Sequence, residues 1–155
     1  MPTAMSLQSF LAHAIKLEHE AETIYRKSAE IINAIEMPDS AAFFLEMAGY
    51  AKRHLEEIMR RAGLTEMPEL PPLAYVWGNN PAPETITPAP TAGSCLNLDE
   101  AMALALSAER RAEAFYAEVA ATSPAAEVRA LAEAFAAEER EHVLALERFM
   151  GSKPY

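Results

Sequence analysis

Two stretches of the sequence share one pattern, "EHEAETIYRKSA" at residues 18–29 and "ERRAEAFYAEVA" at residues 109–120. Both read E-x-x-A-E-x-x-Y-x-x-x-A over twelve residues. At roughly 100° per residue, the apolar positions around each stretch form a single helical stripe. The stripes contain Leu11, Ala14, Ile15, Glu18, Ala21, Tyr25 and Ala29, and Met102, Ala105, Leu106, Glu109, Ala112, Tyr116 and Ala120. We therefore expect two amphipathic helices that bury equivalent faces, each apolar except for one glutamate.

Periodicity and helix-end signals extend this pattern to four helices. They are predicted at residues 6–33, 40–61, 98–121 and 124–150. Pro38 breaks the pattern before the second helix, so that Asp39 or Ser40 can cap it. Gly63 suits the position just beyond the end of the second helix. Ser123 is expected as the N-cap of the last helix, with Pro124 as its first residue.

A proline-rich segment at residues 64–97 separates the two pairs of helices. It holds seven of the eleven prolines and cannot continue a helix. Two helices, a long connection and two more helices are compatible with a four-helix bundle or with two separate helical hairpins. The internal repeat favours the bundle, because the matching positions share one helical face. We expect a single all-α domain over residues 1–155, with Trp77 and Tyr75 tacking the crossover onto it.

Composition and charge exclude several classes of protein. The chain has 155 residues, is 51% apolar and carries a formal charge of −10, which argues against a nucleic-acid partner. No apolar run approaches the length of a membrane span, and no leader-like segment opens the chain, so a cytoplasmic protein is expected. The single cysteine, Cys95, cannot form an internal disulfide or a four-thiolate iron centre.

The glutamates on the apolar stripes point to a metal site. Burying a lone carboxylate costs several kcal/mol unless a partner, a proton or a cation compensates. The fourth helix offers partners on its own stripe, which contains Val128, Phe135, Glu139, His142, Val143 and Leu146. Glu-x-x-His alone is weak evidence, but inward carboxylates on facing helices at one depth would suit a hard divalent ion. Glu22 and Glu113 lie about 40° off their stripes and are expected at the periphery.

With these motifs, the chain resembles a rubrerythrin-type member of the ferritin-like di-iron carboxylate superfamily. The repeated motif, "FLEMAGYAKRHLEEI" and "FAAEEREHVLAL" occur in the family's order, and only the crossover lies outside the resemblance. The resemblance implies an antiparallel ferritin-like bundle with iron ligands at Glu18, His54, Glu109, Glu139 and His142. It would place a sixth, bridging glutamate at position 51, where this chain has Ala51. The family's rubredoxin module is not represented.

Several residues keep two interpretations. His54 is either a metal ligand or a core histidine, and its alignment with His142 across the repeat favours the ligand. Tyr25 and Tyr116 could donate hydrogen bonds to the carboxylates, although plain core packing is the favoured interpretation. Met47, Met59 and Met102 are interpreted as core filler. His13 and His19, without repeat partners, are expected at the surface.

Three functions follow from these residues. The first is an oxidoreductase that reacts with peroxide or dioxygen at one or two iron ions and takes electrons from an external donor, as the resemblance implies. The second is a protein that binds or sequesters iron, zinc or manganese without turnover. The third is a structural bundle with a degenerate metal site. A homodimer is plausible, and neither nucleic acid nor membrane is expected as a partner.

Overall fold

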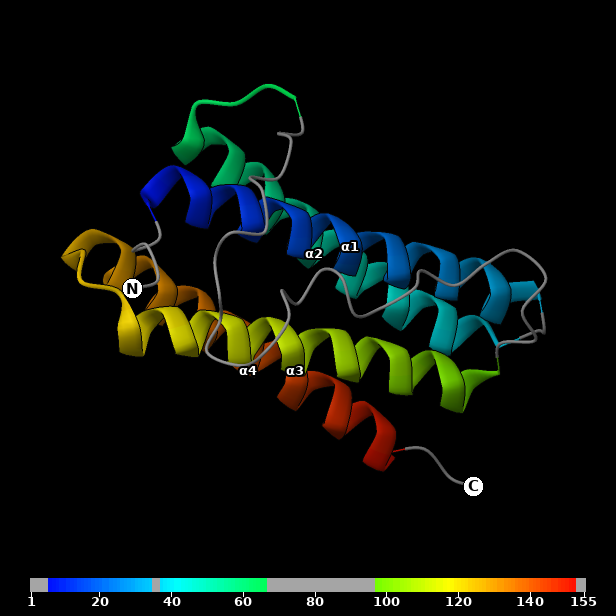
Figure 1. The fold of residues 1–155 in the computed structure, drawn as a ribbon. Helices are drawn as coiled ribbons and strands as arrows, with labels where there is room; N and C mark the ends of the chain where they lie inside the picture. The colour runs from blue at the N-terminus through cyan, green and yellow to red at the C-terminus, as the bar shows by residue number, and fades with distance from the viewer. Residues whose placement is uncertain (1–5, 35–36, 67–96, 153–155) are drawn as a thin grey trace.

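Four long helices make up the described part of the molecule. The computed structural model describes residues 6–34, 37–66 and 97–152. The helices are α1 (Leu7–Ala34), α2 (Pro38–Ala62), α3 (Leu98–Thr122) and α4 (Ala126–Ser152) (Figure 1). No strand occurs in these three ranges, and no helix within them is long and apolar enough to span a membrane. The expected all-α fold is confirmed.

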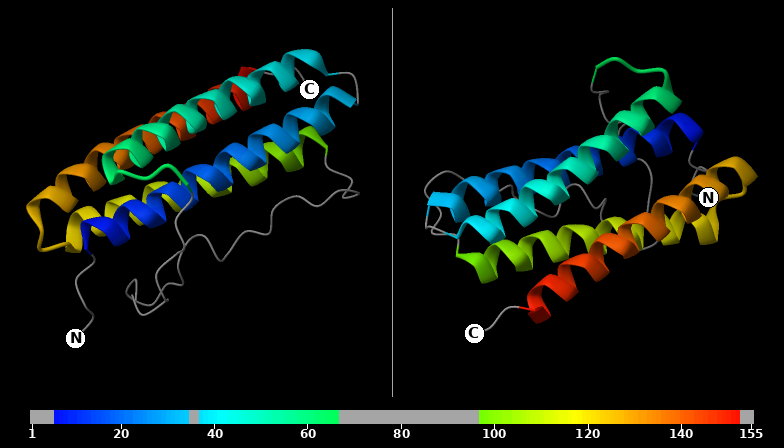
Figure 2. Two further views of the ribbon diagram at one scale, coloured as in Figure 1. Left: turned by 90° about the horizontal axis from the view of Figure 1, so that it is seen from above. Right: turned by 180° about the vertical axis from the view of Figure 1, so that it is seen from behind.

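The helices pack as two antiparallel hairpins, α1 with α2 and α3 with α4, and α1 joins the hairpins by packing against α3. In the views of Figures 1 and 2 the end of α2 and the start of α3 lie at opposite ends of the bundle. This arrangement confirms the four-helix bundle and excludes two independent hairpins. Most of the expected crossover, including Trp77, Tyr75 and Cys95, lies outside the described residues.

Two of the predicted helix starts need correction. Pro38 does not precede α2 but opens it, since the first turn of a helix needs no proline N–H. Met37 occupies the N-cap and makes no side-chain capping bond, so neither Asp39 nor Ser40 caps the helix. The last helix begins at Ala126, two residues later than expected. Ser123 is the C-cap of α3 and not the N-cap of α4, although its hydroxyl accepts a hydrogen bond from the backbone N–H of Ala125 at 3.3 Å.

Other helix ends follow the sequence signals. Gly63 ends α2 in the left-handed region (φ 71°), and its N–H bonds the carbonyl oxygen of Arg60 at 3.1 Å. Asn97 caps α3 by accepting a hydrogen bond from the N–H of Glu100 at 2.8 Å. Asp99 and Glu100 add negative charge to the first turn of α3, where the helix dipole favours it.

The core consists of two apolar clusters, one toward each end of the bundle. One is built around Phe10, Phe115, Tyr116 and Phe135, whose rings stack or meet edge to face. The other contains, among others, Tyr25, Phe44, Met47, Met102 and Leu146. On each helix the boundary between the clusters falls where a polar residue is buried: Glu18 on α1, His54 on α2, Glu109 on α3 and Glu139 on α4. A polar layer therefore crosses the middle of the core.

The two histidines without repeat partners behave differently. His19 is exposed, as expected. His13 is only 1% exposed, with its ring 5.9 Å from that of Phe115, so the surface prediction for it was wrong. The reason is that α1 is buried over more than its apolar stripe, and Ser9, Ile24 and Ser28 are buried with it.

Candidate metal centre

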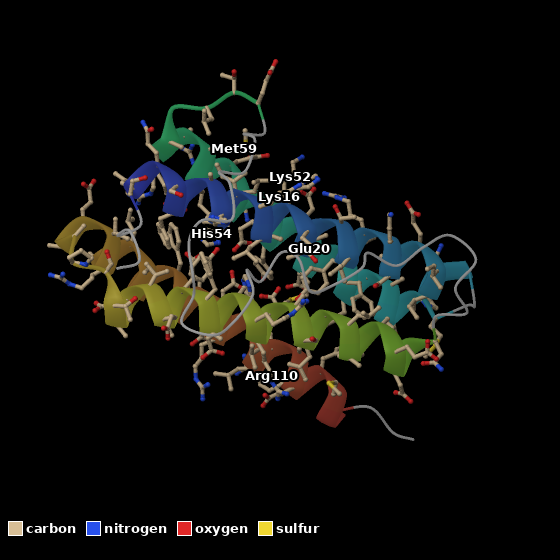
Figure 3. All side chains as sticks on the ribbon, viewed as in Figure 1. Lys16, Glu20, Lys52, His54, Met59 and Arg110 are labelled. Carbon is tan, nitrogen blue, oxygen red and sulfur yellow. The ribbon has the colours of Figure 1, made fainter. Side chains whose placement is uncertain are left out.

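The first half of the polar layer gathers residues from three helices. Nδ1 of His54 on α2 lies 2.9 Å from Oε1 of Glu18 on α1 and 3.9 Å from Oε1 of Glu139 on α4. One potential ligand atom of each of the three residues lies within 4.8 Å of the others. All three side chains are at most 4% exposed. His54 can be found inside the bundle in Figure 3, whereas Arg110 projects outward from α3.

The second half shares Glu139 with the first. Nδ1 of His142 lies 3.4 Å from Oε2 of Glu109 and 3.3 Å from Oε2 of Glu139. Glu109, Glu139 and His142 again present ligand atoms within 4.8 Å of one another. One oxygen of Glu139 faces each histidine, so its carboxylate lies between the two groups. The cluster thus has the form of two three-residue groups joined by one acid, and it contains all five predicted ligands.

The nitrogen and oxygen atoms of the cluster are better placed to bind a metal ion than to form hydrogen bonds with one another. Both ring nitrogens of His54 lie 2.9 Å from a carboxylate oxygen, yet neither is aligned as a hydrogen bond. Oε1 of Glu139 is also buried without a hydrogen-bond partner. Buried polar atoms normally have a partner, and each unsatisfied one costs about 1–3 kcal/mol. Carboxylate oxygens and imidazole nitrogens converging on one point are the ligands that a divalent transition metal uses.

Two tyrosines hold the outer carboxylates across the bundle. Tyr25 on α1 donates its hydroxyl to Oε1 of Glu109 on α3 at 2.8 Å. Tyr116 on α3 reaches Oε1 of Glu18 on α1 at 3.5 Å. Each half of the repeat therefore supports the glutamate of the other half. The interpretation of these tyrosines as plain packing was wrong, because both hydroxyls face the buried acids.

Comparison with known proteins agrees with this geometry. The family model described as Rubrerythrin matches residues 9–150. The chain belongs to the rubrerythrin family. It is also similar to a solved structure, an uncharacterized conserved protein from Magnetospirillum magnetotacticum MS-1, with 35% sequence identity, a TM-score of 0.76 and 97% of each chain covered. No curated protein matches the sequence.

In this rubrerythrin-family cluster the charges interact strongly. Burial lowers the pKa of His54, but the carboxylates of Glu138 and Glu18 outweigh burial and raise that pKa to about 10. Burial raises the pKa of Glu139 well above its usual value, and the charges of Glu109 and Glu18 raise it further. The pKa of Glu109 is lowered, since its contacts with Glu139, His142 and Tyr25 outweigh its burial. Without a cation, protons on the cluster take over part of the charge balance.

Ala51, at the position of the family's bridging glutamate, is 1% exposed and packs in the same apolar cluster as Tyr25 and Met47. It lies one turn before His54 on the inward side of α2. The peripheral acids lie where they were expected. Glu22 pairs with Arg26 at 2.9 Å and Glu113 with Arg140 at 3.4 Å.

Glu138 contacts the cluster although sequence reasoning did not select it. Its Oε2 lies 2.9 Å from Nε2 of His54, and its side chain is half exposed. Glu138 falls outside the apolar stripe of α4, so periodicity marks it as a surface acid. An alignment of α2 with α4 offers the one available signal. It pairs Glu138 with Tyr50 and Glu139 with Ala51, so Glu138 is an acid of α4 that has no counterpart in α2.

Proposed function

We propose that this rubrerythrin-family chain binds iron, as one or two ions, at Glu18, His54, Glu109, Glu139 and His142, and that it reacts there with peroxide or dioxygen. The proposal rests on one observation, the two buried ligand groups that share Glu139. Zinc or manganese would find the same ligands, so the choice of iron follows the family. Bound ferrous iron would supply the electrons that reduce the oxidant.

The residues around the cluster suit such chemistry. Apolar clusters on both sides keep bulk water from the carboxylates, which strengthens every electrostatic interaction at the site. Tyr25 and Tyr116 fix the orientation of Glu109 and Glu18. His142 is the most exposed of the five residues, at 16%, so we place the approach of a small oxidant on its side. We assign the supply of electrons to an external donor, because the single cysteine cannot build a thiolate iron centre.

A second function, metal binding without turnover, is favoured by Ala51. Three carboxylates bring a charge of −3 to the cluster, one less than two divalent ions require for neutrality. Two metal ions with an uncompensated charge in a low-dielectric core are bound less stably. A chain that holds only one ion lacks a second metal to share the oxidation.

One experiment separates these functions. The protein is loaded with ferrous iron without oxygen, freed of excess metal and mixed with one equivalent of hydrogen peroxide while its absorbance is followed. An oxidoreductase oxidises its iron rapidly and consumes peroxide, and it repeats this when a reductant is added. A binding protein retains iron but consumes peroxide no faster than Glu139→Ala with the same total iron. A chain that retains no metal has neither function.

A further inference from the structure

The two halves of the cluster differ at two adjacent positions. Aligning His54 with His142 pairs Ala51 with Glu139 and Tyr50 with Glu138. The fourth helix therefore carries two acids where the second helix carries none. Glu139 points inward and is shared by both ligand groups. Glu138 lies outside the apolar stripe of α4, and its side chain contacts His54, which belongs to the other half of the chain.

The contacts of the two histidines differ accordingly. The ring of His54 lies between Glu18 at Nδ1 and Glu138 at Nε2, each at 2.9 Å, and Phe135 packs edge to face on it at 4.8 Å. Among the described residues, the acids that contact His142 do so at Nδ1. The neighbour of the His142 ring is Tyr50, at 6.3 Å and 24° between the planes. Within the described ranges, His54 and not His142 thus has a carboxylate on its outer nitrogen.

A carboxylate on the outer nitrogen of a histidine has a known physical effect. It accepts the Nε2–H, fixes that tautomer and turns the Nδ1 lone pair toward the metal, which makes the imidazole a stronger donor. It also adds a negative charge one ring away from the ion. The side chain of Glu138 is half exposed, so it can rotate into line with Nε2 without disturbing the core.

We propose that Glu138 is a positioning residue for His54 that supports an ion at Glu18, His54 and Glu139 and supplies the charge missing at Ala51. With Glu138, four carboxylates surround the cluster instead of three. The proposal rests on the metal-binding function above and adds to it that the ion on the side of α2 depends on an acid from α4.

The test measures ion affinity and the hydrogen bonding of the Nε2–H of His54 in Glu138→Gln and Glu138→Ala. Glu141→Gln is the matched control, because Glu141 is an exposed acid three residues further along α4. Anaerobic titration with Fe²⁺ gives the two affinities. Nitrogen-15 spectra of histidine in the Zn²⁺-loaded protein report whether the Nε2–H of His54 is held in a hydrogen bond and so exchanges slowly with water.

Both Glu138 variants should weaken the binding of the ion at Glu18, His54 and Glu139 by about 10- to 100-fold, the usual effect of losing such a partner. The affinity for the ion at Glu109, Glu139 and His142 should stay within about two-fold of the wild type. In Glu138→Ala the Nε2–H of His54 should also exchange rapidly with water, whereas Glu138→Gln, which can still accept the hydrogen bond, should keep the slowly exchanging signal. Unchanged affinities and an unchanged exchange rate of the Nε2–H in Glu138→Ala would overturn the proposal. So would a wild-type chain that holds a single ion, although peroxide reactivity at that ion would leave the proposed function intact.

Discussion

Position 51 lacks the carboxylate that its counterpart in the other half of the chain carries. Glu139 stands three residues before His142, and Ala51 stands three residues before His54. Both pairs have the spacing that puts two side chains on one helix face. Because Ala51 is buried next to the polar layer, a carboxylate there would be directed toward the cluster.

We predict that Ala51→Glu raises the affinity for the more weakly bound ferrous ion at least about ten-fold. The added carboxylate brings a further negative charge and a bridging ligand into a region of low dielectric. Anaerobic titration with Fe²⁺ measures the change. Ala51→Gln, which has nearly the same size without the charge, should not tighten that ion. If Ala51→Glu leaves both affinities unchanged, position 51 does not face the metals and the alignment of the halves is wrong.

The tyrosines provide a second prediction at this scale. Tyr25→Phe removes a 2.8 Å hydrogen bond to buried Glu109 and should lower the free energy of unfolding of the metal-free protein by about 1–3 kcal/mol. Tyr116→Phe should cost less, since its contact with Glu18 is 3.5 Å long. Urea unfolding measures both. Tyr50→Phe is the control, because that hydroxyl bonds Glu46 on the surface. A larger loss in Tyr116→Phe than in Tyr25→Phe would contradict the geometry.

The sequence identified Glu18, Glu109, Glu139 and His142 because they lie on apolar stripes, and the resemblance to rubrerythrins added His54. The sequence did not reveal Glu138, and it favoured packing over hydrogen bonding for Tyr25 and Tyr116. Those contacts join residues far apart in the chain, such as Tyr25 and Glu109, and depend on how neighbouring helices are rotated about their axes. Periodicity fixes which face of a helix is buried, but it does not show which atoms meet across the core.

At the scale of single helices, the two glycines of α2 have opposite roles. Gly49 lies in the helix interior, and an added Cβ would meet only Arg53 Nη1, at 3.8 Å. Gly63 is at φ 71°, where a side chain is strained although nothing lies within 4 Å of the added Cβ. One glycine therefore lowers the stability of its helix, and the other allows the helix to end.

We predict that Gly49→Ala raises the free energy of unfolding by about 1 kcal/mol, the propensity difference between the two residues in a helix interior. Gly63→Ala should lower it by about 1–2 kcal/mol, because the left-handed conformation disfavours a Cβ. Thermal or urea unfolding of the metal-free proteins measures both, and each variant is the control for the other. A loss of stability in Gly49→Ala would show that the glycine accommodates a distortion of α2.

Helix existence was predictable from the sequence, whereas helix starts were less so. Gly63 ends α2 as expected, since it has a specific backbone role, and α3 begins at residue 98 as predicted. Pro38 has two possible roles, a break before a helix or its first residue, and the sequence does not decide between them. Pro124 was taken for a first helical residue, yet α4 begins two residues after it.

For the whole molecule, the polar layer couples stability to pH. The pKa of His54 rises from 6.5 to about 10 on folding of the metal-free chain, so the folded state holds that proton more tightly. The stability it contributes is fully present below about pH 6.5 and is lost as the pH rises through about 10. The raised pKa of Glu139 acts in the same direction.

The metal-free protein should therefore become easier to unfold between about pH 6.5 and 10. The metal-loaded protein should lose less stability over this range, because the ions replace the protons on the cluster. Urea unfolding at several pH values, with and without Zn²⁺, measures the difference. Parallel pH profiles with and without metal would argue against ions and protons sharing these side chains.

Anaerobic titration with Fe²⁺ tests whether one carboxylate joins two metal positions. The wild type is compared with Glu139→Ala by the amount of iron bound per chain. Both ligand groups contain Glu139, so its loss should weaken every bound ion. The wild type should bind one ion tightly and a second more weakly, and Glu139→Ala should bind neither tightly. A wild type that binds no iron, or a Glu139→Ala protein that keeps the wild-type affinities, would contradict a metal centre built on this shared acid.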